Sequence, residues 1–171
     1  VEGFYFMVMA PRGNVLDQGY KTMTYHEVFH IYQMSNIFSS DYEEVDRKSG
    51  RRSGDDSNSD VAWWGEGNAD FFAALYTKDL NNFKEEMKWA LEGNGPFSIP
   101  RKTQFFENGQ KLYNISWSQG ATVDLAYRIG SWFTAYLVHQ NGEQSIYDFW
   151  ETVDKDNFSN TFINVFGKDY K

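Results

Sequence analysis

The stretch TYHEVFHIYQ, residues 24–33, constrains the fold more than any other, because its two histidines can act together only on a helix. On an α-helix, residues four apart lie on one face, so the imidazoles of His26 and His30 can reach a single ion. Glu27 lies beside that face, where it can take a proton from a metal-activated water without being a ligand. The spacing alone leaves two interpretations open: a metal-binding helix, or a chance match on an apolar helix.

A second motif supplies a candidate third ligand. Residues 61–76 read VAWWGEGNADFFAALY, in which Glu66 stands between Gly65 and Gly67 at the start of an apolar helix. Two histidines and one glutamate would leave the fourth position of a zinc ion for water. Asp70, one turn further on the same face, can accept a hydrogen bond from the far ring nitrogen of a ligand histidine. The two glycines would let the helix backbone pack close to a neighbouring helix. Because it follows an HExxH motif, this pattern favours a metal site over the alternative, in which Glu66 only caps the helix and Asp70 is only solvated.

Most of the remaining sequence is predicted to be helical. We expect helices at residues 24–38, 61–76, 80–91, 120–142, 145–153 and 158–166. The apolar run at residues 3–10 favours a strand, and a second short strand is expected at Val15 and Leu16. Residues 39–60, rich in Gly, Ser and charged side chains, predict a long surface loop, and residues 93–119 look irregular. The predicted fold class is therefore mainly α with a small β element (α+β).

Length and charge limit the classes of function. A chain of 171 residues suits one domain, which we place at residues 1–171: a strand and turn region at 1–21, the metal-binding helices at 22–76, and a helical remainder at 77–171. The net charge of −8 argues against a nucleic-acid or anionic-membrane surface. No apolar run approaches the ~18 residues of a transmembrane helix. The absence of cysteine leaves His, Asp and Glu as metal ligands.

Composition and charge also bear on the location of the protein. The absence of cysteine and the acidic charge fit a secreted protein, which we favour, and fit many cytosolic proteins too. The chain begins at Val1 without an initiator Met or a secretory segment, so we read it as a mature product or an excised piece.

Residues 56–60 resemble the start of a second kind of metal site, a calcium-binding loop. Asp56, Asn58 and Asp60 alternate as in the start of a calcium-binding loop. The sixth position holds Val61 where such loops need Gly, and the twelfth holds Gly67 where they need Glu. The pattern favours a plain acidic loop over a Ca²⁺ site.

Together, the two motifs resemble the gluzincin superfamily of zinc metallopeptidases, in which HExxH lies on one helix and a ligand glutamate on the next. HEVFHIYQ followed by WWGEGNADFF is most similar to the W-x-E-G-x-A-[DE]-[YF] block of bacterial collagenase-type peptidases. AYRIGSWFTAYLV, residues 126–138, resembles the helix that opens with Tyr-x-x-Gly in those families. FSNTFINVFGKDY is similar to the F-x-x-x-F-G segment that often closes such domains.

The resemblance implies a zincin-like metallopeptidase domain with one catalytic Zn²⁺ ion. The roles that it implies are zinc ligands His26, His30 and Glu66, general base Glu27, an orienting carboxylate at Asp70, and an oxyanion donor at Tyr127. The strand at residues 3–10 matches the place of the edge strand that pairs with extended substrate, and a plain core strand is an equal alternative. The loop between His30 and Glu66 is longer than in the collagenase-type pattern. Most of the N-terminal sheet and its glycine-rich edge segment are missing, as in one subdomain of a larger enzyme.

The expected function is zinc-dependent hydrolysis of peptide bonds in a peptide or protein substrate, with internal rather than terminal cleavage. Two alternatives stay open. One is a non-catalytic zinc-binding or assembly module on the same scaffold. The other is a hydrolase that acts on a non-peptide bond.

Overall fold

The computed structural model describes residues 18–39, 41–50 and 61–170. In this part of the chain the secondary structure is helical and no β-strand is found, which confirms the mainly α class. The β element predicted at residues 3–10 and 15–16 lies outside the described residues. No helix in the described ranges has the length and apolarity needed to cross a membrane.

The helices follow one another along the chain with short connections. They are α1 Gln18–Ser35, α2 Tyr42–Lys48, α3 Trp63–Thr77, α4 Leu80–Glu92, η2 Gly95–Phe97, α5 Ile99–Glu107, η3 Leu112–Asn114, η4 Trp117–Gln119, α6 Ala121–Asn141, α7 Gln144–Val153 and α8 Phe158–Phe166. Six of them, namely α1, α3, α4, α6, α7 and α8, match the predicted helices to within a few residues at most ends.

Two predictions of irregular structure were wrong. Part of the predicted loop at residues 39–60 forms α2, which ends in Arg47 and Lys48, two cations suited to a helix C-terminus. The predicted irregular region at 93–119 contains α5, which has Pro100 in its first turn. Proline is tolerated there because the first N–H groups of a helix have no intrahelical partner. Both helices are short, so their apolar periodicity is too brief to stand out in the sequence.

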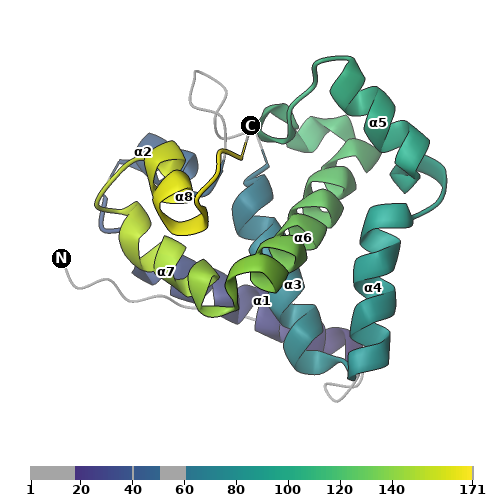
Figure 1. The fold of residues 1–171 in the computed structure, drawn as a ribbon, viewed down its shortest axis with the longest axis horizontal. Helices are drawn as coiled ribbons and strands as arrows, with labels where there is room; N and C mark the ends of the chain where they lie inside the picture. The colour runs from purple at the N-terminus through teal and green to yellow at the C-terminus, as the bar shows by residue number, and fades with distance from the viewer. Residues whose placement is uncertain (1–17, 40, 51–60, 171) are drawn as a thin grey trace.

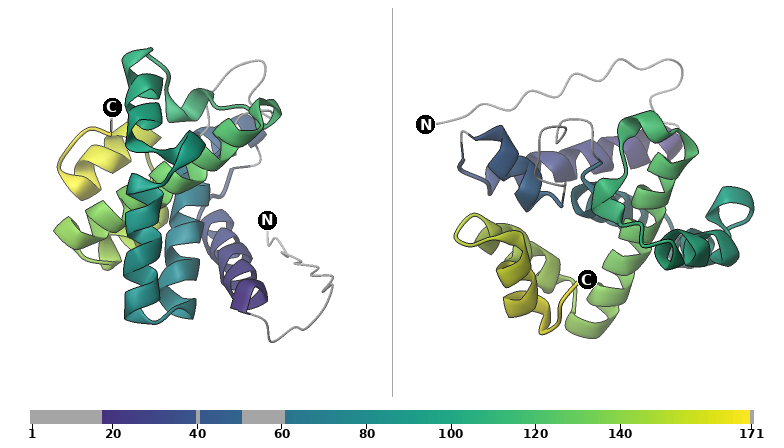
Figure 2. Two further views of the ribbon diagram at one scale, coloured as in Figure 1. Left: turned by 90° about the vertical axis from the view of Figure 1, so that its right-hand side faces the viewer. Right: turned by 90° about the horizontal axis from the view of Figure 1, so that it is seen from above.

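Helix α3 lies at the centre of the molecule, packed between α1 and α6. Figure 1 shows α4 and α5 on one side of α6 and the α7–α8 pair on the other. In the right-hand view of Figure 2, which is seen from above, α1 and α2 lie on one side of the molecule and α7 and α8 on the opposite side. Helices α1 and α3 run antiparallel, and the hydroxyl groups of Thr22 and Thr77 meet at 2.9 Å where α1 begins and α3 ends.

Helices α3 and α6 touch backbone to backbone at a pair of glycines. A Cβ atom added to Gly67 would lie 2.8 Å from the amide nitrogen of Ser131, and one added to Gly130 would lie 2.9 Å from the Cα of Gly67. Side chains cannot occupy that space, so only glycine permits this crossing. The close packing expected of the two glycines that flank Glu66 is therefore found at Gly67. At Gly65 the nearest such contact is an ordinary 3.6 Å.

A buried aromatic core and one buried amide fix α3 in place. Trp64 is fully buried, and its ring lies 5.2 Å from Phe149 of α7 and 5.5 Å from Phe162 of α8. The amide of Asn68, also fully buried, donates to Thr134 of α6 and accepts from the indole N–H of Trp150 of α7. Since buried polar groups are costly unless paired, this amide favours one arrangement of the three helices. The helix that carries Glu66 and Asp70 is thus held from several sides.

Candidate metal centre

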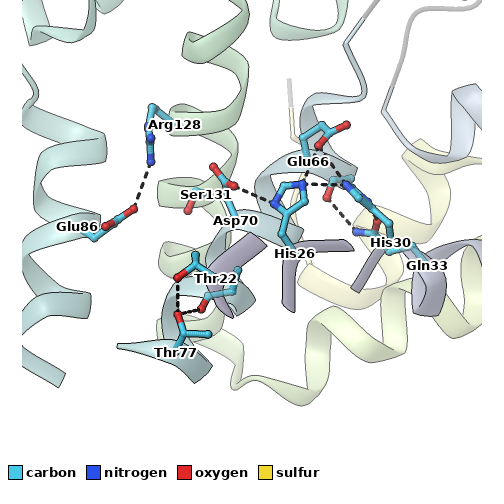
Figure 3. Close-up of polar contacts among 12 residues, drawn as sticks. Thr22, His26, His30, Gln33, Glu66, Asp70, Thr77, Glu86, Arg128 and Ser131 are labelled. Carbon is cyan, nitrogen blue, oxygen red and sulfur yellow. Dashed lines mark hydrogen bonds and ion pairs between the residues drawn. The ribbon is translucent and has the colours of Figure 1, made fainter. Parts of the chain in front are cut away.

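Three acceptor atoms from α1 and α3 converge on one point (Figure 3). The Nε2 atoms of His26 and His30 lie 3.0 Å apart. The Oε2 atom of Glu66 lies 3.2 Å from the first and 3.1 Å from the second. The three side chains are half-buried, with exposures of 14%, 25% and 13%. This triangle of ligand atoms could hold a metal ion.

The local sequence explains why these side chains meet. Phe29 of α1 is buried, and its ring stacks on Phe72 of α3 at 4.5 Å. This contact fixes how α1 is rotated, so that the neighbouring face, which carries His26 and His30, lies against the start of α3. Glu66 stands in the first turn of α3, where the helix dipole favours a negative charge.

The hydrogen-bond partners of His30 determine which of its ring nitrogens is protonated. Gln33 donates from its amide nitrogen to the carbonyl oxygen of Gly65 at 3.0 Å, and a carbonyl can only accept. The Gln33 oxygen is therefore the atom that faces Nδ1 of His30, at 2.7 Å. That nitrogen must donate, so in the neutral ring Nε2 presents a lone pair to the cluster.

The same reasoning applies to His26. Its Nδ1 lies 2.9 Å from the Oδ1 atom of Asp70, so Nδ1–H donates to the carboxylate. In the neutral ring, Nε2 of His26 also presents a lone pair to the cluster. Two imidazole lone pairs and the carboxylate oxygen of Glu66 then face one another within about 3 Å. Three electron-rich atoms this close repel one another unless a positive charge lies between them.

Either a proton or a metal ion can provide that charge. Burial lowers the pKa of His26, but hydrogen bonds and charges of Asp70 and Glu66 outweigh burial and raise it to about 9. Burial raises the pKa of Glu66, but hydrogen bonds from His26 and His30 outweigh burial and lower it to about 2. Without a metal, the cluster therefore holds a protonated His26 beside an ionised Glu66 at neutral pH. A metal ion would replace that proton.

The geometry and the donor set suit zinc. Ligand atoms about 2.0–2.2 Å from a tetrahedral zinc ion are roughly 3.3–3.6 Å apart. The distances of 3.0–3.2 Å found here need only a small outward movement of each side chain. Imidazole and carboxylate are both common zinc ligands, and each histidine already has the outer hydrogen bond that ligand histidines usually make.

Two further predicted residues are close to the cluster in the sequence or in space. Glu27 follows His26 in α1 and is exposed. The ring of Tyr127, from α6, stacks on His26 with the ring centres 6.2 Å apart. Burial, followed by the negative charge of Glu66 and a hydrogen bond to it, raises the pKa of Tyr127 well above its usual value. Tyr127 therefore stays protonated and can donate a hydrogen bond.

The structure thus brings five of the six predicted site residues together, namely His26, His30, Glu66, Asp70 and Tyr127. Glu27 is placed only by its position next to His26 in α1 and by its exposure. The possible calcium-binding residues 56, 58 and 60 lie outside the described part of the chain. The sequence reasoning missed Gln33, although its position three residues after His30 on the same helix face was a signal for it.

No protein-family model, curated protein or solved structure matches this chain. The chemistry of the His26–His30–Glu66 cluster is therefore the main ground for assigning a function.

Proposed function

We propose that this chain is a zinc-dependent peptide hydrolase of the gluzincin type, which cuts peptide or protein substrates internally. One observation carries the proposal. The Nε2 atoms of His26 and His30 converge on the carboxylate of Glu66, while both Nδ1 atoms are already committed to other partners. The resemblance of HEVFHIYQ and WWGEGNADFF to collagenase-type peptidases supports peptide bonds as the target, and the absence of cysteine and the acidic charge fit a secreted location.

The side chains around the cluster suit this chemistry. When bound, zinc supplies Lewis acidity, which activates a water molecule and polarises the scissile carbonyl. Glu27, exposed next to His26, can accept the proton of the attacking water and deliver it to the leaving amine. Tyr127 keeps its proton and shares it with Glu66 in this structure. Once a metal ion takes up the charge of Glu66, the hydroxyl could turn and donate that proton to the oxyanion that forms on the substrate.

The proposal is tested by measuring the zinc content of the purified protein and its cleavage of a broad peptide library. We expect cleavage that a chelator abolishes and that added zinc restores. Stoichiometric zinc with no cleavage would contradict the peptidase and identify a non-catalytic zinc module. Zinc-dependent turnover of another bond, with no peptide cleavage, would contradict the assignment of substrate.

A pair of variants tests the role of Glu27. Glu27→Gln removes the proton acceptor and leaves all three ligands in place, so we expect normal zinc content and a turnover lower by roughly 10²–10⁴-fold. The matched control is Glu85→Gln, which makes the same change at an exposed position of α4 and should leave turnover unchanged. Full turnover by Glu27→Gln would exclude Glu27 as the general base.

A further inference from the structure

Gln33 is a fully buried amide at the junction of the two metal-binding helices. It belongs to α1, and its side chain forms hydrogen bonds to His30 of the metal cluster and to the backbone of α3. Its nitrogen donates to the carbonyl oxygen of Gly65 in α3, and its oxygen accepts from Nδ1 of His30. A fully buried polar side chain is costly unless both ends of it are paired, and here they are.

The orientation of this amide is set from α3. The carbonyl of Gly65 can only accept, so it selects the nitrogen of Gln33 and turns the oxygen toward His30. The amide N–H of Gly65 in turn donates to the carbonyl oxygen of Ser49, which follows α2. A chain of hydrogen bonds thus runs from the end of α2, through the residue before Glu66, to the ring of His30.

We propose that Gln33 is the positioning residue that fixes the tautomer of His30, so that Nε2 faces the metal cluster before any metal arrives. The inference rests on the proposed zinc site and adds a residue to it. Gln33 acts through His30 and touches neither the cluster centre nor a substrate position.

The two histidines are thereby held by different means. Asp70 holds His26 with a full negative charge at 2.9 Å, whereas Gln33 holds His30 with a neutral amide at 2.7 Å. A carboxylate in place of the Gln33 amide would put another buried negative charge beside Glu66. Burying a charge costs free energy unless it is paired. The neutral amide selects the same tautomer as a carboxylate would, without that charge.

Two variants separate positioning from simple packing between the helices. Gln33→Leu removes both hydrogen bonds, whereas Gln33→Glu keeps an acceptor for His30 and turns a carboxylate oxygen, in place of the N–H donor, toward the carbonyl of Gly65. A purely structural Gln33 predicts the same His30 protonation pattern in the two variants, because both lose the bond donated to α3. A positioning Gln33 predicts that they differ. Gln140→Leu, at an exposed position of α6, is the matched control.

The measurements are the protonation pattern of the His30 ring nitrogens by ¹⁵N NMR of the metal-free protein, and zinc affinity by competition with a chromophoric chelator. We expect protonated Nδ1 at His30 in the wild type, Gln33→Glu and Gln140→Leu. We expect loss of that preference in Gln33→Leu, with zinc affinity 10- to 100-fold weaker. Gln33→Glu should bind zinc more tightly than Gln33→Leu, since its carboxylate selects the same tautomer as the wild-type amide.

Two results would overturn the inference. One is protonated Nε2 at His30 in the metal-free wild type, which can be read even if a variant fails to fold. The other is equal zinc affinity of Gln33→Leu and Gln33→Glu. Neither measurement involves a substrate, so a protein that binds zinc but cleaves no peptide would refute the proposed function and leave the role of Gln33 standing.

Discussion

At the scale of single residues, Asp70 is expected to strengthen the binding of a cation by His26. Its carboxylate accepts from Nδ1 of His26 at 2.9 Å and makes the ring a better electron donor at Nε2. Asp70→Asn can keep an oxygen at that position and removes the charge. We expect zinc affinity to fall about 10-fold, within the 10- to 100-fold range typical of such outer partners, as measured by chelator competition.

The control for this prediction is Asp124→Asn, the same change at an exposed position of α6. It should leave zinc affinity unchanged and report any general effect of the lost charge. Unchanged affinity in Asp70→Asn would mean that the hydrogen bond orients the ring and that its charge contributes nothing.

The residues of the site differ in how far sequence predicts them. His26 and His30 could be predicted because helix geometry alone relates positions four apart. Glu66 and Asp70 needed a second motif, which the sequence also contains. The function of Gln33 depends on the carbonyl of Gly65, which is 32 residues away. A backbone acceptor has no signature in the sequence, so that role appears only once α1 and α3 are packed together.

At the scale of helices, the crossing of α3 and α6 depends on Gly67 and not on Gly65. In Gly67→Ala the new Cβ would lie 2.8 Å from the amide nitrogen of Ser131, so the two helices would have to separate. We expect the free energy of unfolding to fall by at least about 1–3 kcal/mol, as for other overpacked cores, measured by urea denaturation.

Gly65→Ala, two residues away on the same helix, is the matched control. Its new Cβ would make only ordinary contacts of 3.6 Å and beyond, and alanine is a better helix former than glycine by about 0.5–1 kcal/mol. We expect stability equal to or above that of the wild type. Equal losses in the two variants would show that the space around Gly67 does not control the crossing.

Helices with a long apolar face were predictable, and short ones were not. The 21 residues of α6 carry enough turns for the period to be evident, and the helix stops at Asn141 as expected. The seven residues of α2 and the nine of α5 give too few turns for that signal. Proline in the first turn of α5 reads equally well as a turn signal, which is why the segment looked irregular.

At the scale of the whole molecule, a metal ion would join two helices that are distant in the chain. His30 and Glu66 are 36 residues apart, so the unfolded chain holds no ready-made site. A ligand that binds only the folded state stabilises it, by about 2.7 kcal/mol when its free concentration is 100 times the dissociation constant. We expect zinc to raise the urea midpoint of the metal-free protein and a chelator to reverse the increase.

Two of the three histidines supply the variants for this prediction. His30→Ala removes one ligand and should abolish most of the zinc-dependent increase. His139→Ala removes an exposed histidine in the last turn of α6, away from the cluster, and should leave the increase intact. Each variant deletes one imidazole, so any binding of zinc to the unfolded chain weakens equally in both. A difference between them in the zinc-dependent increase of the urea midpoint therefore reports on the folded site. An increase that survives in His30→Ala would place zinc elsewhere on the molecule and would remove the basis for a metal centre between α1 and α3.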